Sequence, residues 1–156
     1  MAYDVVVKEV APEHLAGVRG TYRLAELPEV MPRELRRIMA ALQTEGMQPA
    51  GGAVAVYHGW DEETVDAEIG VPIRGVFFPR DPKAGIKAGM VPGGRAVFTV
   101  HVGAYDELGA AYEAIREYAK AKGLELADMM WEKYLSDVAI EPDLGRHITE
   151  VYWPLK

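Results

Sequence analysis

Alternating apolar and polar residues mark extended segments in the first half of the chain. Within Thr64–Ile73, small and branched apolar residues occupy every second position, alternating with Asp66, Glu68 and Gly70. A strand with one face on a core and the other in water shows this alternation. Similar runs rich in β-branched residues predict further strands at 3–10, 14–24 and 53–58.

Between these strands, apolar residues recur at helical spacing. Pro28 and Pro32 suit the start of a helix, because proline lacks the N–H donor that the first turn leaves unused. The apolar stripe that follows consists of Leu35, Ile38, Met39 and Leu42. The charged residues assigned to the wetter side are Arg33, Glu34, Arg36 and Arg37. Gly46 is a plausible end for this helix.

The same order of patterns returns in the second half. Residues 95–102 form a predicted strand, and a helical stripe with a stop at Gly123 follows. The stripe consists of Leu108, Tyr112, Ile115 and Ala119. Two more predicted strands, at 129–135 and 147–155, are joined by a polar loop at 136–146. Each half is therefore predicted to be strand, helix, strand, strand.

Identical residues recur at a constant offset between the halves. Gly46 and Gly123, Ala50 and Ala127, and Tyr57 and Tyr134 are each 77 positions apart. A motif present twice predicts a two-fold pseudo-symmetric domain rather than a solenoid, which needs three or more units. We expect one domain over 1–156, with half repeats at about 1–79 and 90–156 and a Gly-, Pro- and Lys-containing crossover at 80–89.

One position breaks this symmetry with a charge. The first copy has Ala55 two residues before its tyrosine, whereas the second copy has Glu132. Symmetric scaffolds often place a ligand where their halves meet, so the residue that breaks the symmetry is a candidate for specificity. The later segment Glu68–Pro72 is matched by Glu150–Pro154, with five residues inserted before the second copy.

Composition narrows the class of protein. The chain has 156 residues, 49% apolar and 26% charged, which is typical of a soluble globular domain. We expect a cytoplasmic protein, because no run of 18 apolar residues could span a membrane and the N-terminus does not resemble a secretory signal. The lack of cysteine excludes disulfides and thiolate chemistry. A net charge of −7 argues against sequence-independent DNA binding.

The predicted strand around Glu132 carries the candidate binding chemistry. Met130, Glu132 and Tyr134 share one face, and Trp131 lies on the other. Glu132 could pair with an Arg or Lys or point to water. Alternatively, it could line an aromatic cavity and meet a cationic ligand, since each well-placed ring adds about 0.5–2 kcal/mol around a cation. The candidate aromatic walls are Tyr57, Tyr134, Tyr152, Trp131 and Trp153, and core packing is the alternative for each. Met130 is either core or adaptable pocket lining.

Other catalytic templates are weak. The histidines His14, His58, His101 and His147 have no metal-ligand spacing, so we expect no metal and no cofactor. Ser136 lacks the context of a nucleophile elbow. Pro92–Arg95 resembles a phosphate loop but leads into a strand, so it is interpreted as a turn.

Several segments in order resemble one family. In the second half these are Val91–Arg95 before a strand, His101–Leu108 opening a helix, Glu132–Asp137, and Thr149, Glu150 and Pro154. In the first half they are Ala53–Gly59 and Asp66–Pro72. This pattern, over nearly the whole chain, is similar to the GyrI-like small-molecule-binding domain, the effector-binding domain of MerR- and AraC-type multidrug regulators. The chain departs from the family at Val138, where proline is usual, and at Trp131, where many members have a smaller residue, Pro or Arg.

The resemblance implies an α+β fold of two strand–helix–strand–strand halves, with an antiparallel sheet, helices on one side and a central ligand cleft. It implies that Glu132 meets the cation of a hydrophobic, aromatic drug or toxin. Three roles follow: a standalone sensor or sequestering protein, a hydrolase that opens cyclopropane-containing toxins with Glu132 and Tyr134 or Tyr57, or a protein-binding gyrase inhibitor. No DNA-binding helix-turn-helix precedes Tyr3, so we expect no direct contact with nucleic acid.

Overall fold

The computed structural model describes residues 3–79, 84–135 and 143–156, which form two compact units. One unit is Pro12–Pro92, and the other joins Met1–Ala11 to Gly93–Lys156. Each unit is α+β, with a helix packed on one face of an antiparallel sheet of four strands. The predicted fold class is thereby confirmed for each half. The predicted central cleft stays a prediction.

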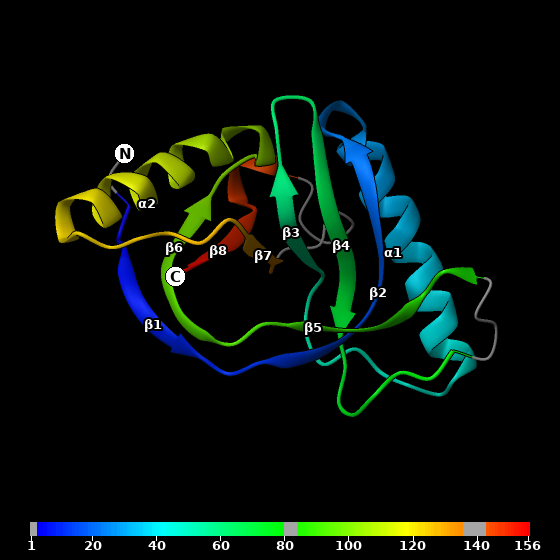
Figure 1. Ribbon diagram of the computed structural model, residues 1–156. Helices are drawn as coiled ribbons and strands as arrows, with labels where there is room; N and C mark the ends of the chain where they lie inside the picture. Colours follow the sequence, from blue (N-terminus) through cyan, green and yellow to red (C-terminus); the bar gives the residue numbers. More distant parts are fainter. Residues whose placement is uncertain (1–2, 80–83, 136–142) are drawn as a thin grey trace. The chain divides into compact units, whose positions relative to one another are not determined.

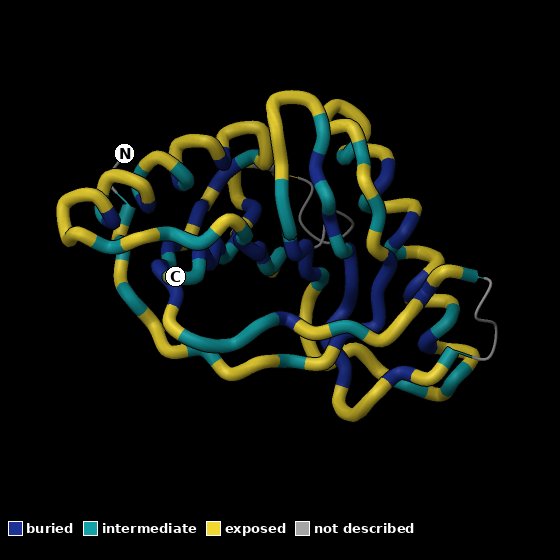
Figure 2. The backbone as a smooth tube through the Cα atoms, in the orientation of Figure 1, coloured by how far each residue is buried: buried dark blue, intermediate teal, exposed yellow. Residues whose placement is uncertain are grey.

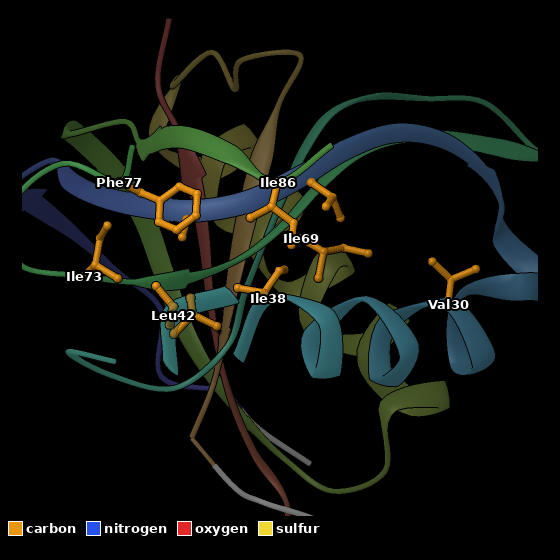
Figure 3. Packing of buried hydrophobic residues seen from close by; sticks show 10 residues of the cluster. Val30, Ile38, Leu42, Ile69, Ile73, Phe77 and Ile86 are labelled. Atoms are coloured by element: carbon orange, nitrogen blue, oxygen red, sulfur yellow. The ribbon is translucent and has the colours of Figure 1, made fainter. Parts of the chain in front are cut away.

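The first unit holds α1 and four strands in the spatial order β3-β4-β2-β5. The elements are β2 (Glu13–Arg23), α1 (Leu27–Thr44), β3 (Val54–Trp60), β4 (Thr64–Pro72) and β5 (Lys87–Val91). The apolar face of the sheet packs against α1, which runs along β2 and β4 in Figure 1. Figure 3 shows this core, in which Ile38 and Leu42 of α1 lie near Ile69 of β4.

The second unit repeats this arrangement in the spatial order β1-β6-β8-β7. The elements are β1 (Val6–Val10), β6 (Gly94–Val102), α2 (Leu108–Lys122), β7 (Met130–Tyr134) and β8 (Ile148–Pro154). Short 3-10 turns, Tyr105–Glu107 and Leu144–Arg146, precede α2 and β8. In both units, Figure 2 shows the helices with their buried residues along one side and exposed residues along the other.

The internal repeat reappears as matching backbone geometry in the two units. Gly46 and Gly123 follow the two helices with φ angles of 69° and 67°, in the left-handed region that favours glycine. The amide of Ala50 donates to the Pro72 carbonyl at 2.8 Å, and the amide of Ala127 donates to the Pro154 carbonyl at 2.8 Å. The offset in the sequence therefore reports a true structural repeat.

The edge strands depart from the predicted grouping. β1, which was placed with the first half, pairs with β6 of the second half. Residues 87–89, predicted to lie in the crossover, and 90–91, predicted to begin the second half, together form the strand β5 and pair with β2. The segment KAGMV has no alternation of branched residues, because an edge strand needs little side-chain packing. Residues 80–83 of the predicted crossover and 136–142 of the predicted loop lie outside the described residues.

Helix α1 differs from the prediction in two details. Glu34, predicted on the wetter side, is buried on the stripe with Val30 and Ile38, whereas Met39 is exposed. The guanidinium groups of Arg33 and Arg37 bind the Glu34 carboxylate, and such pairing is what makes a buried charge tolerable. The other detail concerns Pro32, which lies beyond the first turn, so the helix lacks one N–H donor there.

No helix within the described residues has both the length and the apolar composition needed to cross a membrane.

Candidate functional site

Strand β7 places the Glu132 carboxylate under helix α2. Glu132 pairs with Val151 of β8, and Tyr134 pairs with Thr149, so these side chains share one face of the sheet. Tyr112 of α2 reaches this same face. Only 1% of Glu132 is exposed, even though a carboxylate is costly to remove from water.

Two phenol groups hold the buried carboxylate. The hydroxyl of Tyr134 donates to Oε1 of Glu132 at 2.7 Å. The hydroxyl of Tyr112 donates to the other oxygen, Oε2. Hydrogen bonds to an ionised acceptor are stronger than neutral ones, so the two donors offset part of the cost of burial. The arrangement fixes both carboxylate oxygens while adding no formal positive charge from these two donors.

Further aromatic rings surround Tyr134. The ring of Tyr105 meets that of Tyr134 edge to face, with centroids 5.6 Å apart and an interplanar angle of 82°. Tyr105 also lies 5.2 Å from the ring of the fully buried His147. Edge-to-face geometry of this kind is favourable beyond simple burial of area. The Glu132 carboxylate therefore lies among aromatic side chains that come from β7, from α2 and from the turns that precede α2 and β8.

The opposite face of the same strands carries a separate aromatic stack. Trp131 pairs with Tyr152 across β7 and β8, and their rings stack at 5.3 Å with an interplanar angle of 12°. Phe98 of β6 adds a third ring, 4.9 Å from that of Tyr152. Trp131 is fully buried, and its indole N–H has no acceptor among the described residues. The structure thus separates Trp131 and Tyr152 from the face that holds Glu132.

The remaining predicted wall residues lie in three different places. Met130 is buried on the Glu132 face of β7. Trp153 is also on this face, but its indole N–H donates to the Ala127 carbonyl at 2.8 Å and Arg116 lies 5.1 Å from the ring. Tyr57 is half-buried on β3, in the other unit. Of the seven residues predicted to contact a ligand, Glu132 and Tyr134 are joined by a hydrogen bond on one face of the sheet, and Trp131 and Tyr152 stack on the other.

A family model for the GyrI-like small molecule binding domain matches residues 3–156. The chain belongs to this family. No curated protein sequence matches the chain. The resemblance seen in the sequence is therefore confirmed by a match across almost the whole chain.

Solved structures share the GyrI-like fold at low sequence identity. The C-terminal domain of EcmrR superposes with a TM-score of 0.83 at 21% identity, covering 100% of this chain and 99% of that domain. EcmrR in its complex with DNA gives a TM-score of 0.82 at 20% identity, with 99% of this chain but only 57% of EcmrR covered. SAV2435 bound to tetraphenylphosphonium gives 0.68 at 15% identity, covering 100% of this chain and 94% of that protein.

A hydrolase from Listeria innocua, encoded by lin2189, shares the fold as well. It gives a TM-score of 0.65 at 13% identity, covering 97% of this GyrI-like chain and 91% of the hydrolase. Identities this low show a common fold alone, so the residues of this chain must be judged by their own geometry.

The structure adds three residues to the candidate site of this GyrI-like domain. Tyr112 was predicted only as part of a helical stripe, and Tyr105 and His147 had no predicted role in the site. The apolar stripe correctly predicted that Tyr112 faces the sheet. No sequence pattern, however, specifies which strand a helix residue contacts. The contact between Tyr105 and His147 joins the two short turns. The periodicity of apolar residues could not have predicted it either.

A hollow of about 450 Å³ lies beside the start of α2 in the same unit. It is lined by Tyr3, His101, Asp106, Glu107, Gly109 and Ala110. The Tyr3 hydroxyl meets Nδ1 of His101 at 2.9 Å, and Nε2 of His101 meets the Ala104 carbonyl at 3.0 Å. Because a carbonyl only accepts, Nε2 carries the proton and Nδ1 accepts from Tyr3. Burial and, secondarily, Glu107 raise the pKa of Tyr3.

The described residues contain no cluster of three His, Asp or Glu side chains with metal-binding geometry. The Glu132 carboxylate accepts hydrogen bonds from the phenols of Tyr112 and Tyr134. The chemistry that this site supports is charge complementarity and aromatic contact.

Proposed function

We propose that this GyrI-like domain binds hydrophobic organic cations that carry aromatic rings, as a cytoplasmic sensor or sequestering protein. The observation that carries the proposal is the buried Glu132 carboxylate among Tyr105, Tyr112 and Tyr134. A cation at Glu132 would meet a negative charge and aromatic side chains together.

The energetic argument depends on burial. Removing a carboxylate from water costs several kcal/mol, and in this domain that cost is already part of folding. A cation therefore gains electrostatic attraction in a low-dielectric environment without further desolvation of Glu132. Each aromatic ring in contact adds about 0.5–2 kcal/mol, and the ligand's own apolar surface adds the hydrophobic term.

A structural neighbour supports this chemical class. SAV2435 has been solved with tetraphenylphosphonium, a cation with four aromatic rings. EcmrR belongs to a DNA complex, but the present chain spans only 57% of that protein. The proposal is accordingly limited to ligand binding by the domain.

The direct test is calorimetric titration of the purified chain with tetraphenylphosphonium, followed by mass spectrometry of the recovered ligand. We expect saturable binding with one site per chain and complete recovery of the unchanged compound. Absence of saturable binding to tetraphenylphosphonium and to a cationic aromatic dye such as rhodamine 6G would refute the proposal.

One observation favours a second candidate, a hydrolase. The Tyr134 hydroxyl donates to the Glu132 carboxylate at 2.7 Å, so a proton donor and a proton acceptor already lie side by side. Positioned acid–base groups of this kind supply about 10²- to 10⁴-fold rate enhancement. Incubation with a cyclopropane-bearing alkylator would distinguish the two functions. A water-added product that is absent with Glu132→Gln would establish the hydrolase.

A further inference from the structure

His58 occupies a bulge in strand β3, in the unit that lacks Glu132. Tyr57 pairs with Ala67 of β4, and Gly59 pairs with the next residue, Asp66, so His58 is the extra residue between them. A bulge leaves one residue without a ladder partner and redirects its side chain, and bulges are frequent beside functional sites. The bulge therefore orients the His58 imidazole differently from a side chain in the regular ladder.

The redirected imidazole meets the Glu68 carboxylate. Nε2 of His58 lies 3.0 Å from Oε1 of Glu68, and the two side chains are 23% and 14% exposed. A carboxylate accepts hydrogen bonds, so in the neutral imidazole Nε2 carries the proton and Nδ1 keeps its lone pair. No second hydrogen-bond partner of His58 occurs among the described residues, and the partly exposed ring leaves Nδ1 accessible.

Gly89 of β5 has no side chain, and the Glu68 carboxylate occupies the space where a side chain would lie. A Cβ atom built on Gly89 would lie 2.0 Å from Oε2 of Glu68, far inside contact distance. Any larger residue at position 89 would therefore force the Glu68 carboxylate to shift. Three strands, β3, β4 and β5, together fix the orientation of the imidazole.

The neighbouring charged residues Arg19 and Asp66 bind each other and leave the contact between His58 and Glu68 in place. Arg19 of β2 donates to both oxygens of Asp66, at 3.0 and 2.9 Å. This bidentate contact holds the pKa of Asp66 below its usual value and engages the guanidinium group. Glu68 consequently makes its hydrogen bond to His58 rather than to Arg19.

From this geometry we infer that His58 is a nucleophile towards acylating small molecules, with Glu68 as its positioning residue. The substrate class is activated esters and related acyl electrophiles. A histidine held in one tautomer by a carboxylate, with its other nitrogen accessible, is the arrangement that general-base and nucleophilic catalysis require.

The reaction needs no other reactant than water. The Nδ1 lone pair forms a bond to the acyl carbon as the bond from that carbon to the leaving oxygen breaks. Glu68 stabilises the resulting imidazolium, whose Nε2 proton is then lost to water. Water adds to the acyl carbon of the neutral acylimidazole, the carbon–nitrogen bond breaks, and a proton from that water restores His58.

The test uses p-nitrophenyl acetate and follows p-nitrophenolate release by the full chain. Glu68→Ala and Gly89→Ala should each lower the His58-dependent rate about tenfold. This is less than the 10²- to 10⁴-fold of an optimised acid–base group, because Glu68 acts through His58 and does not itself touch the substrate. His58→Gln should abolish that component, and acid-quenched wild type should carry an acetyl group on His58 by peptide mapping.

His14 provides the matched control, since it is an exposed histidine on β2. His14→Gln should leave the rate unchanged. Nitrogen-15 correlation spectra should show the Nε2–H tautomer of His58 in the wild type and its loss in Glu68→Ala and Gly89→Ala, a readout that does not depend on turnover. An equal rate loss in His14→Gln and His58→Gln, or a tautomer unaffected by Glu68→Ala, would overturn the inference.

Discussion

Glu132→Gln removes the charge of the buried carboxylate and keeps the shape of the side chain. Glutamine has nearly the same size, and its amide can both accept the Tyr134 hydroxyl and donate towards Tyr112. The local packing should therefore survive, while the negative charge disappears. We predict a selective loss of affinity for a cationic ligand.

The expected magnitude follows from the burial of Glu132. Two unit charges about 5 Å apart interact by about 3 kcal/mol at an effective dielectric constant of about 20. Glu132 is only 1% exposed, so ligand binding removes little additional water from the carboxylate. We expect a loss of about 2–3 kcal/mol, which corresponds to about 30- to 150-fold weaker binding of tetraphenylphosphonium.

The assay compares tetraphenylphosphonium with the neutral triphenylphosphine oxide by calorimetric titration of wild type and variant. The neutral compound should change by less than about threefold, or about 0.6 kcal/mol. Glu150→Gln is the matched control, because Glu150 lies on the opposite face of β8 and accepts from the Tyr152 hydroxyl at 3.1 Å. Equal losses for both ligands, or an equal effect of Glu150→Gln, would refute the role of the Glu132 charge.

Three further predictions concern stability and are measured by urea or thermal unfolding. Gly46→Ala and Gly123→Ala should each cost about 1–2 kcal/mol, because both sites need a left-handed backbone; a neutral result at either would contradict the matching helix ends. Glu34→Leu should be neutral or stabilising, whereas Arg37→Ala should destabilise, because it removes one partner of a buried pair. Asp61 accepts from the amides of Thr64 and Glu63, which hold the pKa of its carboxyl below its usual value. Its contribution is therefore present at neutral pH and lost as pH falls through the lowered pKa, so the melting temperatures of wild type and Asp61→Ala should converge in acid and differ at pH 7.

Local patterns predicted the elements well because alternation and helical spacing report burial directly. The first six residues of strand β4 show this, since Val65, Ala67 and Ile69 are the buried ones within 64–69. The pairing of β1 with β6 could not be predicted in the same way. Periodicity specifies which face of a strand is apolar, but it does not specify which distant strand completes the ladder.

The candidate site was predictable only in part for a related reason. The repeat identified Glu132 as the position that breaks the symmetry, and strand alternation placed Tyr134 on the same face. Tyr112 was counted as core because a phenol on an apolar stripe looks like packing. Its role depends on the contact between α2 and β7, which joins residues that no local pattern connects.

Among the described residues, each unit buries one carboxylate, but the two come from different layers, a helix and a sheet. Glu34 lies on helix α1, where the repeat places Ala111 in α2, and Glu132 lies on β7, where the repeat places Ala55 in β3. The donors decide what each carboxylate can do. Two arginines neutralise Glu34 and make it part of the scaffold. Two phenols stabilise Glu132 without contributing a formal charge, and this difference is the basis for proposing that Glu132 attracts a cation.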